Sequence, residues 1–256
     1  MKIKFLGTHN CESRQAKLVS LLIDDTLALD AGSLTSSLSF TAQKKLRAIL
    51  LTHQHYDHIR DIPILAMNLF LHETNIRVYS IPEVRDSLEN HLFNHELYRD
   101  FLEFPEGNPT IKFNLLSPQE EMLLDGYRIL PVPVNHSVPT VGLQVTSAGG
   151  STIFYTSDTG PGLADCWQQI SPQLLIIETT APNRYEDFGR KSRHLTPGLL
   201  QDELETFRTI KGYLPQIVLV HMNPQQEKEI AAEVAEVAAA LKHPITLAHE
   251  GMQLYL

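Results

Sequence analysis

One stretch of the chain is unusually rich in residues that bind metals. The heptapeptide Thr-His-Gln-His-Tyr-Asp-His begins at residue 52 and directly follows Ala48–Leu51, an apolar run that predicts a buried strand. In an extended segment, side chains two positions apart point the same way, so His53 and His55 can reach one ion. Asp57 and His58 follow where the chain turns toward a helix, and we expect them to reach a second point nearby. Imidazole and carboxylate donors suit zinc, and also manganese or iron.

Three more residues of the same chemical types stand just beyond predicted strands. They follow the apolar runs Ile129–Val134, Thr152–Tyr155 and Ile217–Val220, and they are His136, Asp158 and His221. Open sheets carry their sites along such a strand edge, so we expect these side chains to gather there. The alternative, a histidine-rich surface loop at residues 52–58, does not account for three further donors at strand ends.

The elements that must position these donors alternate between strands and helices. Strand-like runs are Lys2–Leu6, Lys17–Ile23, Thr26–Leu29, Ala48–Leu51, Arg77–Ser80, Thr110–Leu116, Arg128–Val134, Val141–Thr146, Thr152–Tyr155, Leu174–Glu178, Gln216–Val220 and Met252–Leu256. Helical runs are Phe40–Leu46, Ile62–Leu71, Glu83–Phe101, Gly162–Ile170, Pro197–Thr206 and Gln226–Leu241. Two blocks of sheet, each followed by helices, predict two sheets face to face with helices outside. Because no Pro/Gly-rich linker separates them, we expect one domain over residues 1–256, with a helical excursion at about 83–104.

Composition narrows the classes of protein that this chain can be. Its 256 residues are 43% hydrophobic, which is enough for a sizeable core. The net charge of −9 argues against a broad nucleic-acid binder, because such proteins carry a basic face. Cys11 and Cys166 give no disulfide framework, and the apolar runs are of strand length. We therefore expect a cytoplasmic protein with no membrane partner.

The ligand pattern resembles that of a known family. A His-x-His-x-Asp-His run followed by a lone His, Asp and His at strand ends is similar to the metallo-β-lactamase superfamily, and the resemblance extends from Phe5 to Met252. It implies an α/β fold, the αββα four-layer sandwich, with the site at the edge between two sheets. It also implies two divalent metal ions, most readily zinc, with manganese or iron as alternatives.

The resemblance assigns each donor a role. It implies that the first ion is held by His53, His55 and His136, that the second is held by Asp57, His58 and His221, and that Asp158 bridges them. Asp57 is also placed to orient the attacking hydroxide, which makes it a catalytic residue.

A further pair of residues narrows the chemistry within this superfamily. Glu178 ends a predicted strand, and His194 stands in Arg-His-Leu-Thr-Pro just before a helix. The pair resembles the Glu–His dyad and His-x-Thr motif of the ribonuclease Z branch. There the histidine acts near the scissile phosphate and the glutamate holds its tautomer; a positioned imidazole can protonate a leaving alkoxide. The alternative is that Thr196 and Pro197 only begin the helix while Glu178 is a surface strand end.

The segment Asn90–Phe101 resembles a helical segment of class II cyclic-nucleotide phosphodiesterases. The residues that fit the pattern are His91, Phe93, Asn94, Asp100 and Phe101. Tyr98 and Arg99 stand where the family has Trp-Pro, which leaves the nucleobase end of the pocket open. The alternative is an amphipathic helix that packs on the sandwich or on a second copy in a homodimer.

A large RNA substrate is disfavoured. Ribonuclease Z enzymes usually carry a long Gly/Pro-rich arm, whereas only a hairpin fits between His136 and Asp158. The negative net charge argues the same way. One basic cluster precedes His194, and it is either a solvated loop or a small phosphate-attracting rim made by Arg184, Arg190, Lys191 and Arg193.

The sequence therefore predicts a dinuclear metal phosphodiesterase that acts on a small cyclic phosphodiester, with a 3′,5′-cyclic nucleotide such as cyclic AMP or cyclic GMP as the best candidate. The partner is then a small-molecule phosphodiester substrate. The alternatives are a thioesterase or lactonase of the glyoxalase II type, a ribonuclease Z-like nuclease, and a nucleotide-binding regulator with little turnover.

Overall fold

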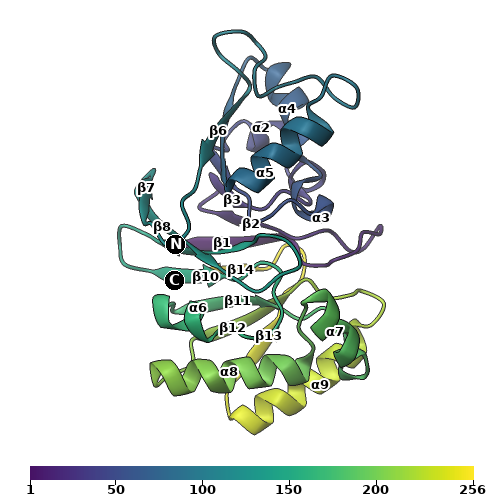
Figure 1. Ribbon diagram of the computed structural model, residues 1–256, viewed down its shortest axis with the longest axis vertical. Coiled ribbons are helices and arrows are strands. Elements are labelled where there is room, and N and C mark those ends of the chain that lie inside the picture. The colour runs from purple at the N-terminus through teal and green to yellow at the C-terminus, as the bar shows by residue number, and fades with distance from the viewer. The chain divides into compact units, whose positions relative to one another are not determined.

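The computed structural model describes all residues from 1 to 256, and the chain divides into two compact units. Unit 1 comprises Met1–Gly7, Glu12–Ser117 and His249–Tyr255, and unit 2 comprises Thr8–Cys11, Pro118–Ala248 and Leu256. Each unit contains one seven-stranded mixed sheet with helices of its own (Figure 1). The prediction of an α/β fold with two sheets is confirmed, and the expectation of a single domain stays a prediction.

The sheet of unit 1 has the order β14-β1-β2-β3-β4-β5-β6. The strands are β1 (Lys2–Gly7), β2 (Ser20–Ile23), β3 (Leu27–Leu29), β4 (Ala48–Leu50), β5 (Ile76–Ser80), β6 (Ile111–Leu115) and β14 (Gln253–Tyr255). Pairing is antiparallel from β14 to β3 and parallel from β3 to β6. Every residue of β3 and β4 is buried, which is why these strands read as continuous apolar runs rather than alternating ones.

The helices of unit 1 are short, and most lie beside the parallel half of its sheet (Figure 1). They are α1 (Leu34–Ser37), α2 (Phe40–Gln43), α3 (Tyr56–Ile59), α4 (Ile62–Phe70), α5 (Pro82–Ser87) and the π-helix η1 (Leu88–Leu92). The helix predicted over Glu83–Phe101 therefore ends at Leu92.

Beyond Leu92 the chain forms turns that are held by its own side chains. The Asn94 Oδ1 accepts hydrogen bonds from the backbone N–H groups of Glu96 and Leu97, and such side-chain bonds compete with a helix. Phe93 and Phe101 are buried with their ring centroids 6.3 Å apart. These contacts favour the packing alternative for the segment.

Arg99, one of the two residues that depart from the family's Trp-Pro, also has a structural role. The Arg99 guanidinium lies 3.6 Å above the centroid of the Phe104 ring. Stacking of this kind is a favourable cation–π contact, so Arg99 is used within unit 1 in packing.

The sheet of unit 2 has the order β13-β12-β11-β10-β9-β8-β7. The strands are β7 (Met122–Leu124), β8 (Tyr127–Pro133), β9 (Val141–Thr146), β10 (Thr152–Tyr155), β11 (Leu174–Glu178), β12 (Gln216–Val220) and β13 (Ile245–Leu247). Pairing is antiparallel from β7 to β10 and parallel from β10 to β13. The short strands β7 and β13 were not predicted from the sequence.

The helices of unit 2 lie against its sheet (Figure 1), and a large apolar core fills the space between them. They are α6 (Ala164–Gln169), the 3₁₀ turn η2 (Asn183–Tyr185), α7 (Glu186–Ser192), α8 (Pro197–Lys211) and α9 (Glu227–Leu241). Trp167 of α6 and Phe207 of α8 pack edge to face in this core, with ring centroids 5.3 Å apart. Across the whole chain, none of the helices has the length and hydrophobicity needed to span a membrane.

Candidate metal centre

The donors of unit 1 are organised by a buried carboxylate, Asp30. It follows β3, whose neighbour β4 runs parallel with Leu29 opposite Leu50, so the residues after both strands share one edge of the sheet. The Asp30 carboxylate accepts hydrogen bonds from the Thr52 backbone N–H at 2.9 Å, from the Thr52 hydroxyl at 3.0 Å and from His58 Nδ1 at 2.7 Å. A charge-assisted network of this kind fixes the start of the candidate metal-binding run at residues 52–58.

The four predicted donors of unit 1 lie close together. The His53 ring centroid lies 4.7 Å from that of His55 and 4.2 Å from that of His58. The Oδ2 of Asp57 lies 3.5 Å from the Nε2 of His58. His53 and His58 are fully buried, whereas the Asp57 side chain keeps 29% of its exposure. Unit 1 thus presents three imidazoles and one solvent-accessible carboxylate in one place.

The backbone of helix α3 packs closely against the turn that follows β3. The Ala31 N–H donates to the His58 carbonyl at 2.7 Å. A Cβ on Gly32 would come within 2.3 Å of the Asp57 carbonyl oxygen, so only glycine fits there. The turn after β3, which the sequence indicated only as a sharp exit, therefore supports α3.

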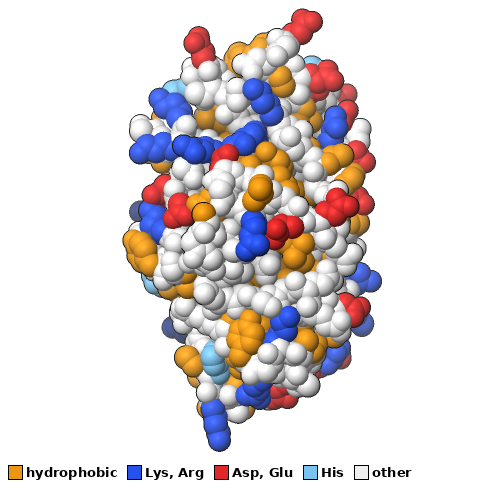
Figure 2. All heavy atoms as spheres, turned by 90° about the vertical axis from the view of Figure 1, so that its left-hand side faces the viewer, with side chains coloured by type: hydrophobic (Ala, Val, Ile, Leu, Met, Phe, Trp, Pro, Cys, Tyr) orange, Lys and Arg blue, Asp and Glu red, His pale blue; other side chains and the backbone are white.

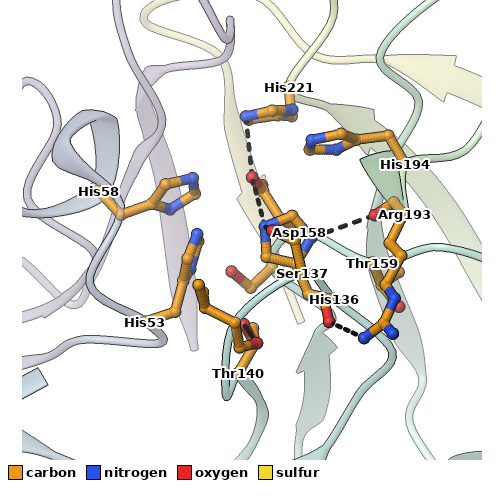
Figure 3. A network of polar contacts seen from close by, with 12 residues as sticks. His53, His58, His136, Ser137, Thr140, Asp158, Thr159, Arg193, His194 and His221 are labelled. Atoms are coloured by element: carbon orange, nitrogen blue, oxygen red, sulfur yellow. Dashed lines mark hydrogen bonds and ion pairs between the residues drawn. The ribbon is translucent and has the colours of Figure 1, made fainter. Parts of the chain in front are cut away.

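The donors of unit 2 come from three separate strand ends. Asp158 follows β10 and His221 follows β12, two strands that share a direction with β11 between them. His136 follows β8, which has the same direction because two antiparallel pairings separate it from β10. The Asp158 Oδ2 lies 3.3 Å from His221 Nε2 and 3.9 Å from His136 Nε2 (Figure 3). The structure thus brings these three predicted residues together.

His136 is held in place by Arg193, which the sequence indicated only as part of the basic cluster. The Nδ1 of His136 donates to the Arg193 carbonyl at 3.1 Å, and the Arg193 guanidinium donates back to the His136 carbonyl (Figure 3). Arg193 holds a left-handed backbone with φ of 59°. A Cβ on Gly160 would come within 2.8 Å of the Arg193 Cα, so this loop also requires glycine. Burial lowers the pKa of His136 and favours the neutral imidazole that binds metals.

The predicted dyad is present in unit 2. Glu178 is fully buried, so the surface alternative is wrong, and its Oε1 accepts a 2.6 Å hydrogen bond from His194 Nδ1. The same oxygen accepts from the Thr159 N–H at 2.9 Å. Its Oε2 accepts from the Leu195 N–H at 3.1 Å and from the Thr180 hydroxyl at 2.7 Å. Four donors therefore hold the carboxylate rigidly.

These bonds favour a positioning role for Glu178 over a metal-binding one. Donor atoms of Glu178, His194 and His221 lie within 4.8 Å of one another, which by itself would also suit a metal ion. A carboxylate that already accepts four hydrogen bonds has little capacity left for a metal. The His194 side chain is 17% exposed and its ring stacks on that of His221 at 5.3 Å, so His194 is both oriented and accessible.

The helix after His194 begins as expected but without a side-chain cap. Thr196 occupies the N-cap position of α8 with Pro197 at the first turn, yet its side chain makes no capping hydrogen bond. The helix-start alternative therefore accounts for Pro197, but it does not account for the hydrogen bond between His194 and Glu178.

Most of the basic cluster is engaged within unit 2. Arg184 pairs with Glu229 at 3.0 Å, and Arg190 pairs with Glu186 at 2.8 Å. Arg193 contacts His136, as described above. Figure 2 draws a different face of the molecule, on which basic, acidic and apolar side chains are interspersed. These pairs favour the solvated-loop alternative over a phosphate-attracting rim.

The donor sets of both units fit a divalent ion. A tetrahedral zinc ion with bonds of about 2.0 Å separates its ligand atoms by about 3.3 Å. The pairs His221–Asp158 and His58–Asp57, at 3.3 and 3.5 Å, lie close to this value. The Nδ1 atoms of His58 and His136 donate to a carboxylate and a carbonyl, so both histidines present the Nε2 lone pair.

Sequence reasoning missed four residues that support the donors, namely Asp30, Thr52, Thr180 and Arg193. For Asp30 the signal was available, because it is a carboxylate directly after a buried strand, and Glu178 likewise ends one. Thr52 and Thr180 are ordinary threonines in the sequence, and only their contacts reveal them.

Comparison with known proteins places the chain in a family. Residues 27–243 match the family model described as a Beta-lactamase superfamily domain, and the chain belongs to this family. Ribonuclease Z of Methanococcus maripaludis is 29% identical over 150 residues, which are 55% of this chain and 47% of that protein. Ribonuclease Z of Methanocaldococcus jannaschii is 26% identical over 152 residues, or 55% and 45%. The chain thus spans about half the length of these curated relatives.

Solved structures show the same fold over nearly the whole chain. Unliganded yeast PDE1 has a TM-score of 0.85 at 16% identity, with 100% of this chain and 99% of that chain covered. The short form of human tRNase Z has a TM-score of 0.71 at 19% identity, covering 100% and 99%. The metallo-β-lactamase fold protein YhfI from Bacillus subtilis has a TM-score of 0.75 at 18% identity, covering 99% and 98%. These likenesses confirm the predicted fold class, and the family match confirms the metallo-β-lactamase resemblance.

Proposed function

We propose that this member of the metallo-β-lactamase superfamily is a metal-dependent phosphodiesterase that hydrolyses a small cyclic phosphodiester, best a 3′,5′-cyclic nucleotide. The observation that carries the proposal is the 2.6 Å hydrogen bond from His194 Nδ1 to the buried Glu178 carboxylate. A fixed, accessible imidazole beside phosphoryl-binding metals suits an alkoxide leaving group, which needs a proton. The likeness to yeast PDE1 and the similarity to ribonucleases Z support the same bond type.

The proposed metal ligands are those expected from the sequence. One ion would be held by His53, His55 and His136, the other by Asp57, His58 and His221, with Asp158 shared between them. Zinc suits these donors best, and manganese or iron are alternatives. When bound, the ions would supply Lewis acidity, which activates water and offsets negative charge on phosphoryl oxygens.

The dyad supplies the proton. As an imidazolium, His194 keeps Nδ1–H on Glu178 and presents Nε2–H to the leaving 3′ or 5′ oxygen. As the P–O bond breaks, the proton on Nε2 passes to that oxygen and leaves a neutral imidazole with Nδ1 still protonated. Glu178 is held by three further donors, so the ring does not need to reorient. Asp57, with its partly exposed carboxylate, would orient the attacking water.

Hydrolysis assays test the proposal directly. Protein loaded with zinc, manganese or iron is incubated with cyclic AMP, cyclic GMP and bis-p-nitrophenyl phosphate. Turnover of at least one cyclic nucleotide is expected, and no turnover of any of these substrates with any ion would refute the proposal.

A comparison of leaving groups tests the role of His194. We expect His194→Ala to lower cyclic AMP turnover by about 100-fold or more, because an alkoxide needs a general acid. The loss should be much smaller with bis-p-nitrophenyl phosphate, because nitrophenolate leaves without protonation. Metal content should stay near that of the unmodified protein. The exposed His72 provides the matched control, since His72→Ala should change neither substrate's turnover.

A ribonuclease Z-like nuclease is the second candidate, favoured by the sequence similarity to two archaeal ribonucleases Z. Cleavage of a precursor transfer RNA without turnover of cyclic nucleotides would select it. Robust thioester or lactone hydrolysis that is unaffected by His194→Ala would select the glyoxalase II-like alternative. Tight nucleotide binding without product would indicate a regulator. The cytoplasmic location and the homodimer stay predictions.

A further inference from the structure

We infer that Thr52 and Thr180 are positioning residues that hold His53 and His221 in the tautomer that presents Nε2 to a metal ion. Each threonine hydroxyl connects a buried carboxylate to a histidine. The inference rests on the proposed function in taking His53 and His221 as ligands, and the contacts themselves lie within a single unit in each case.

The count of protons in unit 2 leaves one arrangement. The Thr180 Oγ1 lies 2.7 Å from Glu178 Oε2 and 2.9 Å from His221 Nδ1. A carboxylate only accepts hydrogen bonds, and a hydroxyl has a single proton to donate. Thr180 therefore donates to Glu178 and accepts from His221, which requires a proton on His221 Nδ1. The lone pair of His221 is then on Nε2, the atom that lies 3.3 Å from Asp158 Oδ2.

A competing contact of Thr180 does not change this result. Its Oγ1 also lies 3.3 Å from His194 Nδ1. That nitrogen makes the much shorter 2.6 Å bond to Glu178 Oε1, and this bond uses its proton. The lone pair of Thr180 remains available to His221.

Unit 1 repeats the arrangement with different residues. The Thr52 Oγ1 lies 3.0 Å from both oxygens of Asp30 and 3.0 Å from His53 Nδ1. Its single proton goes to the carboxylate, so it accepts from His53 Nδ1 and leaves the lone pair on Nε2. All of these groups are fully buried, so water does not compete for the same bonds.

Each carboxylate thus controls two histidines. Asp30 binds His58 directly and reaches His53 through Thr52, while Glu178 binds His194 directly and reaches His221 through Thr180. Partners of this kind fix ring orientation and ligand basicity at metal sites, and their loss typically lowers metal affinity by about 10- to 100-fold.

The test uses Thr52→Val and Thr180→Val, which keep the side-chain shape and remove the hydroxyl. Thr52→Ser and Thr180→Ser restore the hydroxyl and should restore the behaviour of the unmodified protein. Thr179→Val is the matched control, because Thr179 is a fully buried neighbour whose hydroxyl donates to the Glu178 backbone carbonyl. Circular dichroism and urea unfolding identify any variant that fails to fold, and in that case the serine variant decides.

The first measurement is the tautomer of each histidine. Ring ¹H–¹⁵N spectra of the metal-free protein are recorded above neutral pH, with His53→Gln and His221→Gln used to assign the signals. Both histidines should carry the proton on Nδ1 in the unmodified protein and in the serine and Thr179→Val variants. In Thr52→Val, His53 should lose its preference for a proton on Nδ1, and in Thr180→Val, His221 should lose it. A proton on Nε2 in the unmodified protein would overturn the inference.

The second measurement is zinc affinity by chelator competition. Zinc affinity should fall by about 10-fold or more in Thr52→Val and Thr180→Val, and it should stay unchanged in the serine and Thr179→Val variants. Unchanged zinc affinity in both Thr52→Val and Thr180→Val would overturn the positioning role of these threonines. Neither measurement uses a substrate, so a failure to hydrolyse phosphodiesters leaves the inference standing. A protein that binds no divalent ion would overturn the proposed function, and the tautomer spectra would still decide whether the hydroxyls act as described.

Discussion

The two buried carboxylates, Asp30 in unit 1 and Glu178 in unit 2, occupy similar positions but serve different histidines. Each follows or ends a buried strand, accepts a backbone N–H and a threonine hydroxyl, and accepts from the Nδ1 of a histidine. Asp30 makes its direct bond to His58, a proposed metal ligand. Glu178 makes its direct bond to His194, the proposed general acid, and reaches a ligand only through Thr180.

With the proposed roles, one local arrangement serves two kinds of chemistry. A carboxylate bonded to Nδ1 makes Nε2 a metal-binding atom when the ring is buried among other donors, as His58 is. The same bond makes Nε2 a proton donor when the ring is accessible, as His194 is. Neutralising the two carboxylates should therefore damage different functions.

Glu178→Gln should have the largest effect. The glutamine amide group would face two of the four donors that now bond to Glu178, and unsatisfied buried groups cost about 1–3 kcal/mol each. We expect the free energy of unfolding to fall by about 3 kcal/mol in urea titrations. Turnover of cyclic AMP should fall by about 100-fold, because the amide NH2 would replace the oxygen that accepts from His194. Bound zinc should stay near the level of the unmodified protein, because the amide oxygen can still accept from Thr180 and so keep the proton on His221 Nδ1. Loss of zinc instead would make Glu178 part of the metal site.

Asp30→Asn should show the opposite pattern. Asparagine tolerates the left-handed backbone at this position, where φ is 56°, so the backbone itself should not be disturbed. We expect a loss of about 2 kcal/mol in stability, because the amide group would face the Nδ1–H of His58. The histidine can relieve this conflict by moving its proton to Nε2, and zinc affinity should then fall. Retained zinc with lost turnover would remove the distinction between the two carboxylates.

Arg193 should show a smaller effect that separates its side chain from its backbone. Arg193→Ala removes the guanidinium bond to the His136 carbonyl and should cost about 2 kcal/mol. Arg193→Gly removes the same bond but relieves a left-handed residue, so it should cost about 1 kcal/mol. Urea unfolding of the pair measures the difference. Equal losses would show that the left-handed backbone adds no cost.

Tyr56→Ser should have the smallest effect. Tyr56 lies between two donors in the sequence, yet its side chain points outward and is 62% exposed. Exposed substitutions typically change stability by less than about 0.5 kcal/mol. Zinc content and thermal unfolding should match those of the unmodified protein, and a clear loss of metal would show that the donor run depends on this side chain.

The sequence predicts the candidate donors because residue type and position both point to metal binding. His136, Asp158 and His221 were predicted because each stands near the end of an apolar run, and parallel strands bring such ends to one edge. His194 was predicted instead from the motif in which it stands, just before a helix. The supporting contacts were not visible, because Thr52, Thr180 and Arg193 act through hydrogen bonds between segments far apart in the chain. The short strand Ile245–Leu247 depends on pairing with β12 rather than on its own composition.

Helix prediction failed after Leu92 for a similar reason. The residues up to Phe101 include good helix formers, but the Asn94 side chain bonds the next backbone N–H groups and stops the helix. The residues that resembled a phosphodiesterase segment, Phe93 and Phe101, pack in the core of unit 1. Their role in substrate binding remains a prediction.

The most direct test of the account is the rate of cyclic AMP hydrolysis by zinc-loaded protein, measured for the unmodified chain, after chelation, and for His194→Ala. We expect turnover that chelation abolishes and that His194→Ala lowers by about 100-fold with zinc retained. Turnover by His194→Ala equal to that of the unmodified protein would contradict the dyad. Absence of hydrolysis with zinc, manganese and iron would contradict the proposed phosphodiesterase itself.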